Sequence, residues 1–255
     1  TGLLNLGGTI LGTSREKPFK KRASTSTNKP ALILKNIKDL QLDCIVCIGG
    51  NGTQKTACKL AELGVNVVSV PKTIDNDIYG TDITFGFQSA VTVVSESIDR
   101  IRTTANAHQR MMVVEVMGDL SGWIALHSGI SSAADVVLIP EIEFDLKKVV
   151  ECVKAKKAKG QREIIVVVAE GCRLNGKLVT VRNKENGDER LGGIGNRLSK
   201  ILEEMTGIET RYCVLGHTQR GGSPCPFDRI LGIRFGVEAV KLIEEKQFGR
   251  TMVLN

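Results

Sequence analysis

Two carboxylates near the middle of the first half of the chain have a spacing suited to metal and proton chemistry. Asp75 and Asp77 alternate along a short stretch, so in an extended conformation both side chains face the same side. Upstream, Gly49, Gly50 and Gly52 come directly after an apolar run. A glycine turn that opens a helix directs backbone N–H groups toward an anion. Together the patterns predict phosphoryl transfer, which needs a polyphosphate cradle, a Mg²⁺ anchor and a base for the attacking hydroxyl.

Each pattern has a plainer interpretation when it is taken alone. A Gly-Gly-x-Gly turn after a strand is also typical of a tight connection. An Asp-Asn-Asp stretch is also typical of a solvated loop or a helix cap. Their combination across one strand–helix–strand unit favours a nucleotide or phosphate site over both of these interpretations.

One local unit is expected to position these residues. The β-branched apolar run at residues 44–48 predicts a buried parallel strand. Residues 53–62 have helical character that ends at Gly64. Residues 65–70 predict a second strand, which Pro71 is expected to break. Because ligands of open α/β sheets bind at the carboxyl ends of the strands, the carboxylates after this strand lie where a site is expected.

The rest of the chain continues the alternation of strands and helices. Helices are predicted over residues 31–40, 84–102, 145–159, 195–206 and 230–244, and strands over residues 111–117, 136–140, 164–169 and 212–215. Residues 16–29 predict a polar loop, and residues 176–193 predict a polar excursion. The alternation predicts an α/β fold with mostly parallel sheets flanked by helices.

Composition narrows the class of protein. The 255 residues are enough for one large or two modest domains, and 42% hydrophobic with 25% charged residues is ordinary for a globular chain. The net charge of +7 would also suit a nucleic-acid binder, but the Lys and Arg residues are scattered and aromatics make up only 4%. We therefore expect phosphorylated small molecules as partners, and no nucleic acid.

Cysteine content and hydropathy indicate where in the cell the protein is expected to act. Seven cysteines are present, and Cys44 and Cys47 fall in the first predicted strand, where a free thiol behaves as a small hydrophobe. This predicts reduced thiols and a cytoplasmic location. No apolar run approaches the roughly 18 residues of a membrane span, so no membrane partner is expected.

Four segments resemble the 6-phosphofructokinase family and occur in its order. They read GGNGT, PKTIDND, HQRMMVVEVMGDLSGW and ETRYCVLGHTQRGGSPCPFDR, and the resemblance runs from Gly7 to about Gly249. It implies two Rossmann-like domains in the phosphofructokinase fold. Residues 1–86 plus 219–255 would bind the nucleotide or phosphoryl donor, and residues 87–218 the sugar phosphate. An earlier strand with another Gly-rich phosphate loop is not found, so the sequence looks truncated at both ends.

The resemblance implies transfer of a phosphoryl group from ATP to the 1-hydroxyl of fructose 6-phosphate, with Mg²⁺ as cofactor. The implied catalytic residues are Asp75 as general base, Thr73, Arg15 and Lys72. The implied nucleotide-binding residues are Arg15, Glu16, Gly50, Asn51, Gly52 and Thr53. The implied substrate-binding residues are Thr73, Ile74, Asp75, Arg110, Met117, Gly118, Asp119, Glu170, Arg211, His217 and Arg220. Asp77 and Asn51 are the implied metal ligands.

Two positions depart from the family pattern. Asn51 stands where the family usually has Asp, so its amide oxygen would ligate the metal or a bound water without adding charge. Asp119 stands where most members have Arg, which removes a cationic contact to the transferring phosphoryl group. A non-catalytic regulatory subunit is therefore one alternative.

A different class of kinase is another alternative. NAD kinases and lipid kinases also carry GGxGT loops, but they lack a GHxQRGGSP segment.

Two residues give opposing indications of the phosphoryl donor. In the family, a carboxylate at the position of Gly52 goes with pyrophosphate use, so a glycine there favours ATP. Lys72 beside Thr73, however, occurs in pyrophosphate-using members. We expect ATP, with a pyrophosphate-dependent fructose 6-phosphate 1-phosphotransferase as the alternative.

The resemblance also bears on assembly and regulation. Arg110 and Arg211 would reach the sugar phosphate of a neighbouring subunit, which implies a homotetramer with shared active sites. Arg102 and Asp135 match positions of the bacterial effector site, but Gln161 and Glu163 stand where that site carries basic side chains. We therefore expect weak or absent activation by ADP.

Overall fold

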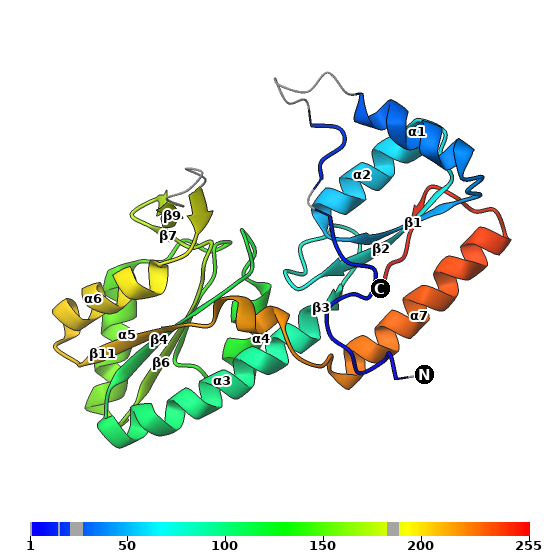
Figure 1. Ribbon diagram of the computed structural model, residues 1–255. Coiled ribbons are helices and arrows are strands. Elements are labelled where there is room, and N and C mark those ends of the chain that lie inside the picture. The colour runs from blue at the N-terminus through cyan, green and yellow to red at the C-terminus, as the bar shows by residue number, and fades with distance from the viewer. Residues whose placement is uncertain (1, 15, 21–27, 183–188) are drawn as a thin grey trace. The chain divides into compact units, whose positions relative to one another are not determined.

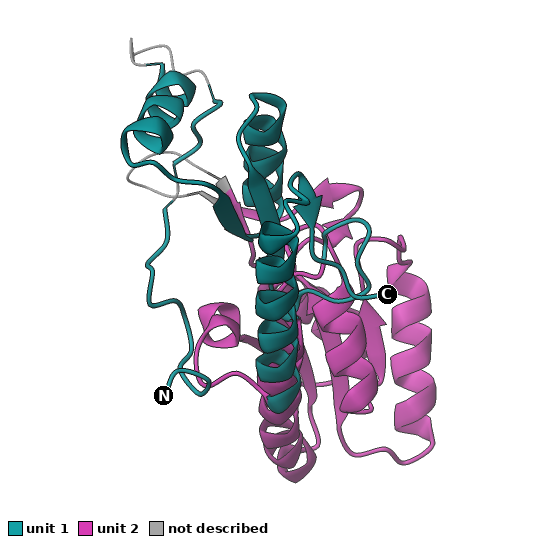
Figure 2. Ribbon diagram, turned by 90° about the vertical axis from the view of Figure 1, so that its right-hand side faces the viewer, with its two compact units in different colours: residues 1–73, 77–86, 226–255 teal, residues 74–76, 87–225 magenta. Residues whose placement is uncertain are grey.

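The computed structural model spans the chain and describes all residues except 1, 15, 21–27 and 183–188 (Figure 1). The chain divides into two compact units (Figure 2). The first consists of Thr1–Thr73, Asp77–Gly86 and Pro226–Asn255, and the second of Ile74–Asn76 and Phe87–Cys225. Each unit has a parallel sheet with helices beside it, which confirms the predicted α/β class. The roles expected for the two domains stay predictions.

The sheet of the first unit is parallel throughout. Its strands are β1 (Ile45–Gly49), β2 (Val67–Thr73), β3 (Phe85–Gly86) and β12 (Arg250–Thr251). Strand β2 pairs with each of the other three, in the order β1-β2-β12 with β3 beside the end of β2. The glycine turn follows β1, and the acidic stretch follows β2, so both leave the sheet at its carboxyl edge.

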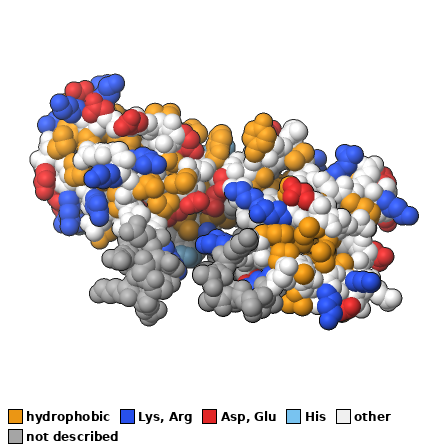
Figure 3. Space-filling view, turned by 90° about the horizontal axis from the view of Figure 1, so that it is seen from above, with side chains coloured by type: hydrophobic (Ala, Val, Ile, Leu, Met, Phe, Trp, Pro, Cys, Tyr) orange, Lys and Arg blue, Asp and Glu red, His pale blue; other side chains and the backbone are white. Residues whose placement is uncertain are grey.

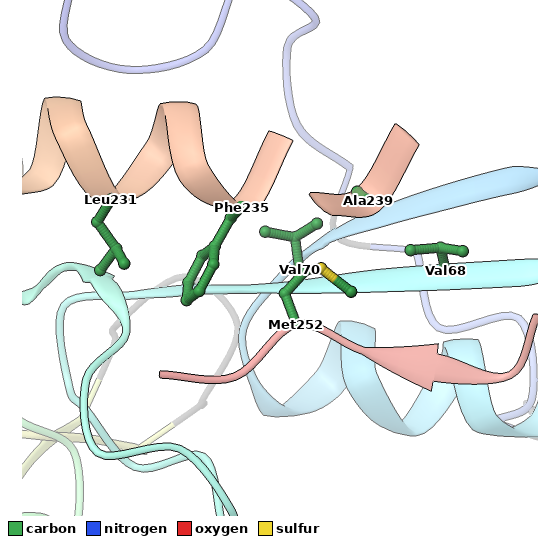
Figure 4. Packing of buried hydrophobic residues seen from close by; sticks show 6 residues of the cluster. All are labelled: Val68, Val70, Leu231, Phe235, Ala239 and Met252. Atoms are coloured by element: carbon green, nitrogen blue, oxygen red, sulfur yellow. The ribbon is translucent and has the colours of Figure 1, made fainter. Parts of the chain in front are cut away.

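Three helices cover the two faces of this sheet (Figure 1). Helices α1 (Lys29–Asp39) and α2 (Asn51–Glu62) lie on one face, and α7 (Pro226–Glu244) lies on the other. Figure 4 shows α7 directing its apolar side chains toward Val68 and Val70 of β2, with Met252 beside them. The neighbouring Val67 packs with the apolar side chains of α2, because successive strand residues point to opposite faces.

Strand β2 does not break at Pro71, and that prediction was wrong. It continues to Thr73, with Pro71 opposite Gly49 of β1. On the other edge of β2, pairing with β12 ends at Ser69 and pairing with β3 begins at Lys72. Pro71 therefore falls in a gap between two ladders, where a missing N–H costs little.

Part of the first unit carries exposed apolar side chains. Among the described residues, β1 pairs only with β2, so its second edge is open. Val46 and Ile48 of this edge strand are 42% and 46% exposed. Along α7, a stripe of exposed apolar residues follows the helical period; it consists of Phe227, Ile230, Ile233, Val237 and Val240.

The second unit is built on a four-stranded parallel sheet with the order β11-β4-β6-β5. Its strands are β4 (Met111–Val116), β5 (Val136–Leu138), β6 (Ile164–Ala169) and β11 (Thr210–Val214). Helices α3 (Phe87–His108) and α4 (Trp123–Ser131) pack on one face, and α6 (Ile194–Thr206), with α5 (Leu146–Ala158) beside it, on the other (Figure 1). All residues of β4 and β6 are buried, as the apolar runs predict for strands covered on both faces.

The start of α3 and the structure of the expected excursion also differ from the sequence-based expectation. Helix α3 begins at Phe87 rather than Thr84, because Phe85 and Gly86 pair with the end of β2 and Gly86 has a positive φ of 105°. The expected excursion at residues 176–193 contains short antiparallel strands. Strand β9 (Thr180–Arg182) pairs with β10 (Glu189–Leu191), and β8 (Lys177–Leu178) pairs with β7 (Arg173–Leu174), which lies just before the predicted range. After β11, a single 3-10 helix, η1, spans Gly216–Arg220.

Positive charge is dispersed over the visible surface (Figure 3), and the cysteines form no disulfides. Lys and Arg side chains are spread over the face seen in Figure 3 and do not gather in one block. In the described parts of the chain, the helices are too short or too polar to cross a bilayer. All seven cysteines are free thiols in the structure.

Candidate active site

The glycine turn after β1 forms a close connection between strand and helix. A Cβ placed on Gly49 would collide with the side chain of Thr53 in the first turn of α2. The side-chain amide of Gln54 donates hydrogen bonds to the carbonyl oxygens of Gly49 (2.9 Å) and Val70 (3.1 Å). Gln54 thus ties the carboxyl ends of β1 and β2 to the helix, and sequence reasoning gave it no role.

The N-terminus of α2 is open to a ligand. Gly50 is the N-cap; it carries no capping side chain, and the first turn of α2 contains no acidic residue. The first backbone N–H groups of the helix and its partial positive charge are therefore available to an anion. Gly52 lies in this turn. Apart from its chain neighbours and the backbone of its own helix, no described atom comes within 4 Å of the Cβ that another residue would carry there. The space beside Gly52 is open, as the sequence-based argument for ATP requires.

Asn51 and Asp77 meet beside this helix terminus, within the first unit. The side-chain amide of Asn51 donates hydrogen bonds to the carboxylate of Asp77 and, at 3.4 Å, to its carbonyl oxygen. No set of three His, Cys, Asp or Glu side chains gathers for a metal among the residues that the structure describes. One carboxylate with an adjacent amide oxygen still fits Mg²⁺, which keeps several waters and binds proteins through one or two carboxylates plus substrate phosphates.

The end of β2 carries Lys72 and Thr73, which also belong to the first unit. Lys72 is exposed, and Thr73 is half-buried. The Cβ of Thr73 lies 3.5 Å from the Cβ position of Gly50, so the two strand ends approach each other. The hydroxyl of Thr84 donates to the carbonyl oxygen of Thr73 at 2.8 Å and fixes the backbone there.

Asp75 belongs to the second unit together with Ile74. The hydroxyl of Ser121 donates to the carbonyl oxygen of Asp75 at 3.2 Å, and Ser121 is itself buried. Ser121 ends the loop that leaves β4, which we call the β4 loop (residues 117–121). The structure therefore brings the candidate base together with the β4 loop, which contains three of the candidate substrate-binding residues.

Glu170 holds the backbone of the β4 loop. One of its carboxylate oxygens, Oε1, accepts hydrogen bonds from the N–H groups of Gly118 (3.2 Å) and Asp119 (3.1 Å). Both residues have positive φ angles, 152° and 54°, and a Cβ on Gly118 would overlap the carbonyl oxygen of Ser121. The loop thus needs glycine at 118 and a side-chain acceptor at 170.

The charge state of Glu170 depends on this environment. Burial raises the pKa of Glu170 above its ordinary value, and the hydrogen bonds from Asp119 and Gly118 oppose that shift. The nearby charges of Asp75 and Glu115 raise the pKa of Glu170 further. A carboxylate with a raised pKa beside a candidate base is typical of functional sites.

The turn η1 carries the candidate phosphate ligands His217 and Arg220. Gln219 lies between them and is only 2% exposed. Its Oε1 accepts a hydrogen bond from the N–H of Met117 at 3.2 Å, and its Nε2 donates to the carbonyl oxygen of Gly216 at 3.0 Å. The structure therefore connects the His217 and Arg220 turn with the β4 loop through a residue to which the sequence gave no role.

Arg110 and Arg211 are not brought to this group of residues. Arg110 precedes β4 and Arg211 lies near the start of β11, at the amino edge of the sheet. The six residues of β4 separate this edge from the β4 loop by about 20 Å. The two arginines instead meet at Glu209, whose carboxylate lies 3.4 Å from Arg110 and 2.8 Å from Arg211.

Two candidate nucleotide ligands lie near the beginning of the chain. Arg15 lies outside the described residues. Glu16 forms an ion pair with Lys29 at the start of α1. Of the functional candidates that sequence reasoning missed, Gln219 lies within a motif that signals the site. Ser121 also lies within a quoted motif, HQRMMVVEVMGDLSGW, whereas Gln54 directly follows the GGNGT segment and lies outside all four.

Comparison with known proteins identifies the group to which this geometry belongs. The family model described as phosphofructokinase matches residues 1–243. A relative named ATP-dependent 6-phosphofructokinase 3, from Bacteroides thetaiotaomicron, is 53% identical over all of this chain and 72% of its own length. A relative named pyrophosphate–fructose 6-phosphate 1-phosphotransferase, from Amycolatopsis methanolica, is 46% identical over 99% of this chain and 73% of its own length.

Solved structures agree with these relatives. A phosphofructokinase structure from Saccharomyces cerevisiae superposes with a TM-score of 0.80 at 32% identity and covers 96% of this chain. The chain spans about a third, 34%, of the length of that yeast chain. The order of the four motifs, the two α/β units and these matches lead to one conclusion: the chain belongs to the phosphofructokinase family.

Proposed function

We propose that this protein is an ATP-dependent 6-phosphofructokinase, which phosphorylates the 1-hydroxyl of fructose 6-phosphate in glycolysis. The observation that carries this proposal is the position of Asp75, which is hydrogen-bonded through its backbone to Ser121 of the β4 loop. This arrangement places a carboxylate at the carboxyl edge of a parallel sheet, where ligands of α/β proteins bind. The name of the relative from Bacteroides thetaiotaomicron supports ATP as the donor.

Asp75 is the general base in this proposal. It takes the proton of the sugar hydroxyl as the bond to phosphorus forms, a role that requires an ionised carboxylate within hydrogen-bond reach. Asp77 follows it after one residue, so chain geometry alone keeps their Cα atoms within about 7 Å. The base and the proposed metal ligand are thus linked through the backbone.

The donor phosphates bind at the N-terminus of α2. Its uncapped backbone N–H groups favour an anion, and Gly52 leaves room beside them. Asp77 and Asn51 would hold Mg²⁺, which neutralises phosphate charge when it is bound. Lys72 is exposed at the end of β2, where its ammonium group attracts the phosphates of either donor.

A pyrophosphate-dependent enzyme is the second candidate, and Lys72 is the feature that favours it.

The sugar phosphate binds to the second unit. Glu170 and the β4 loop present carboxylate and backbone groups to sugar hydroxyls, and His217 with Arg220 binds the phosphate. Arg110 and Arg211 lie at the other edge of the sheet and serve the site of a neighbouring subunit in a homotetramer. The free thiols are compatible with the cytoplasm as the place of action.

Replacing Asp75 by Ser tests the proposal. We expect kcat with ATP and fructose 6-phosphate to fall by about 10²–10⁴-fold, because the base is lost. The affinity for fructose 6-phosphate, measured by calorimetry, should stay within about threefold, since phosphate contacts carry most of the charge-assisted binding. Unchanged activity in this variant would refute the assignment and favour a non-catalytic subunit. A parallel assay with pyrophosphate distinguishes the two donors.

A further inference from the structure

Gln219 connects the two parts of the candidate sugar-phosphate site. We propose that Gln219 is a positioning residue that couples the turn carrying His217 and Arg220 to the β4 loop, so that both bind the sugar phosphate in one geometry. The inference rests on the proposed function, because it assigns the sugar phosphate to these two segments. Gln219 itself is buried and does not contact the ligand in this proposal.

The β4 loop is held from both neighbouring strands. Strand β4 lies between β6 and β11, and its exit loop would otherwise present three consecutive N–H groups without partners in the sheet. Glu170, after β6, accepts from Gly118 and Asp119. Gln219, after β11, accepts from Met117 at 3.2 Å. The backbone of the loop is therefore fixed by one side chain from each side.

The amide group of Gln219 makes two different hydrogen bonds at once. Its oxygen accepts from Met117, and its nitrogen donates to the carbonyl oxygen of Gly216 in its own turn. Only a side-chain amide of this length combines an acceptor and a donor in these positions at neutral pH. A carboxylate would face the Gly216 carbonyl without a proton, and an apolar side chain would leave both backbone groups without this partner.

This bridge determines how η1 leaves the sheet. Gly216 has a positive φ of 49°, and the buried Gln219 anchors the other end of the same turn. His217 and Arg220 belong to this turn, on either side of Gln219 in sequence. When the buried amide is fixed against Met117, the backbone positions from which the two basic side chains extend are held relative to the β4 loop. A small displacement of such groups weakens binding even when each side chain is intact.

The test compares Gln219→Met and Gln219→Glu with the unchanged protein. Met keeps the volume and loses both hydrogen bonds, whereas Glu keeps only the acceptor. Gln161→Met is the matched control, because Gln161 also makes two hydrogen bonds in the second unit, to Asp135 at 2.7 Å and to the carbonyl of Glu163 at 3.0 Å. We expect both Gln219 variants to raise KM for fructose 6-phosphate by roughly ten- to a hundredfold, with KM for ATP within about twofold.

The control separates positioning from stability. Gln161→Met should lower Tm by a similar amount to Gln219→Met and leave KM for fructose 6-phosphate unchanged. The proposal is overturned if the Gln219 variants lower Tm while both KM values stay constant, or if both KM values rise equally. Either result would make Gln219 a packing residue.

A second measurement does not depend on turnover. Hydrogen exchange of peptides spanning residues 117–121 and 216–220 should accelerate together in Gln219→Met and remain slow in Gln161→Met. Acceleration in only one of the two peptides would refute the coupling. If the unchanged protein phosphorylates no fructose 6-phosphate with either donor, the proposed function fails, and the exchange experiment still decides whether Gln219 couples the two segments.

Discussion

Among single residues, Gly52 and Glu170 show how the size or the charge of one side chain determines what the candidate site can bind. Gly52 is the clearest example, because the space beside its Cα is open while the helix terminus behind it attracts anions. Glu170 is another, because the same carboxylate fixes the β4 loop and has a raised pKa.

Replacing Gly52 by Asp should change donor use without harming the fold. A carboxylate in the first turn of α2 should raise stability by about 0.5–1 kcal/mol, through helix propensity and the helix dipole. It should lower kcat/KM for ATP by roughly 10- to 100-fold, because it places negative charge beside the donor phosphates. Steady-state kinetics with ATP and urea denaturation measure the two effects. ATP kinetics identical to those of the unchanged protein would contradict this account of donor selection.

The raised pKa of Glu170 predicts a pH dependence of stability. Because the folded state holds the proton more tightly than the unfolded chain, the stabilisation from Glu170 is complete below its ordinary pKa of 4.5. It is lost as the pH rises through the raised value. The side-chain amide of the variant Glu170→Gln stays neutral at every pH, so the variant should gain stability relative to the unchanged protein across this window.

Urea denaturation between about pH 4 and pH 7 measures this difference. The curves of the two proteins should diverge as the pH rises and run parallel beyond the window. Parallel curves over the whole range would show that burial does not shift the pKa of Glu170.

At the scale of elements, the strand–turn–helix unit around β1 and α2 could be predicted from local sequence. Its apolar run, its glycines and its helical stretch are all short-range signals. The end of β2 could not be predicted in the same way, because Pro71 is tolerated only where two neighbouring ladders leave a gap. The start of α3 was missed for a related reason: residues 85–86 take a partner in β2 instead of a helical turn.

The candidate site shows the same limit. Asp75, Asp77 and the glycines carry recognisable patterns. Gln219 and Ser121 lie within quoted motifs, but their roles become visible only through backbone partners that are distant in sequence. Gln219 bonds to Met117, and no periodicity in the sequence indicates that contact. The expectation of weak or absent activation by ADP stays a prediction; Glu163 lies 3.5 Å from Arg102 in the expected effector position.

Two glycines of the first unit offer a matched test of the strand–helix connection. Gly49→Ala should destabilise the protein by about 1–3 kcal/mol, because its Cβ would collide with Thr53. Gly52→Ala, three residues along in the same motif, should be neutral or stabilising by up to about 1 kcal/mol, because its Cβ meets nothing within 4 Å. Chemical denaturation of both variants checks the prediction. Equal effects would mean that the close approach at Gly49 is not a constraint.

At the scale of the whole molecule, the sheet of the second unit presents chemistry at both of its edges. The β4 loop and η1 lie at the carboxyl edge, and the Arg110–Glu209–Arg211 group lies at the amino edge. A protein that uses both groups for one substrate needs more than one copy of the chain. The separation of these two groups within a single unit therefore supports the proposed oligomer.

Mixing two inactive variants tests this expectation. Asp75→Ser lacks the base, and Arg211→Ser lacks the arginine proposed to come from the neighbour. If the chains are unfolded together and refolded, random assembly leaves about a quarter of the shared sites with both groups intact. Activity should therefore return to roughly that fraction of the unchanged protein. No recovery, although mixed oligomers form, would place both groups in the same chain.

The open edge of β1 favours self-association of the chain. Among the described residues, β1 is an edge strand paired only with β2, and Val46 and Ile48 are partly exposed on it. Its second edge can therefore pair with another extended peptide. The chain should consequently become turbid as its concentration rises or as it is warmed, well before its sheets lose their order. The variant Val46→Lys would place a charge on this edge strand and should delay aggregation. Light scattering would measure the later onset of turbidity.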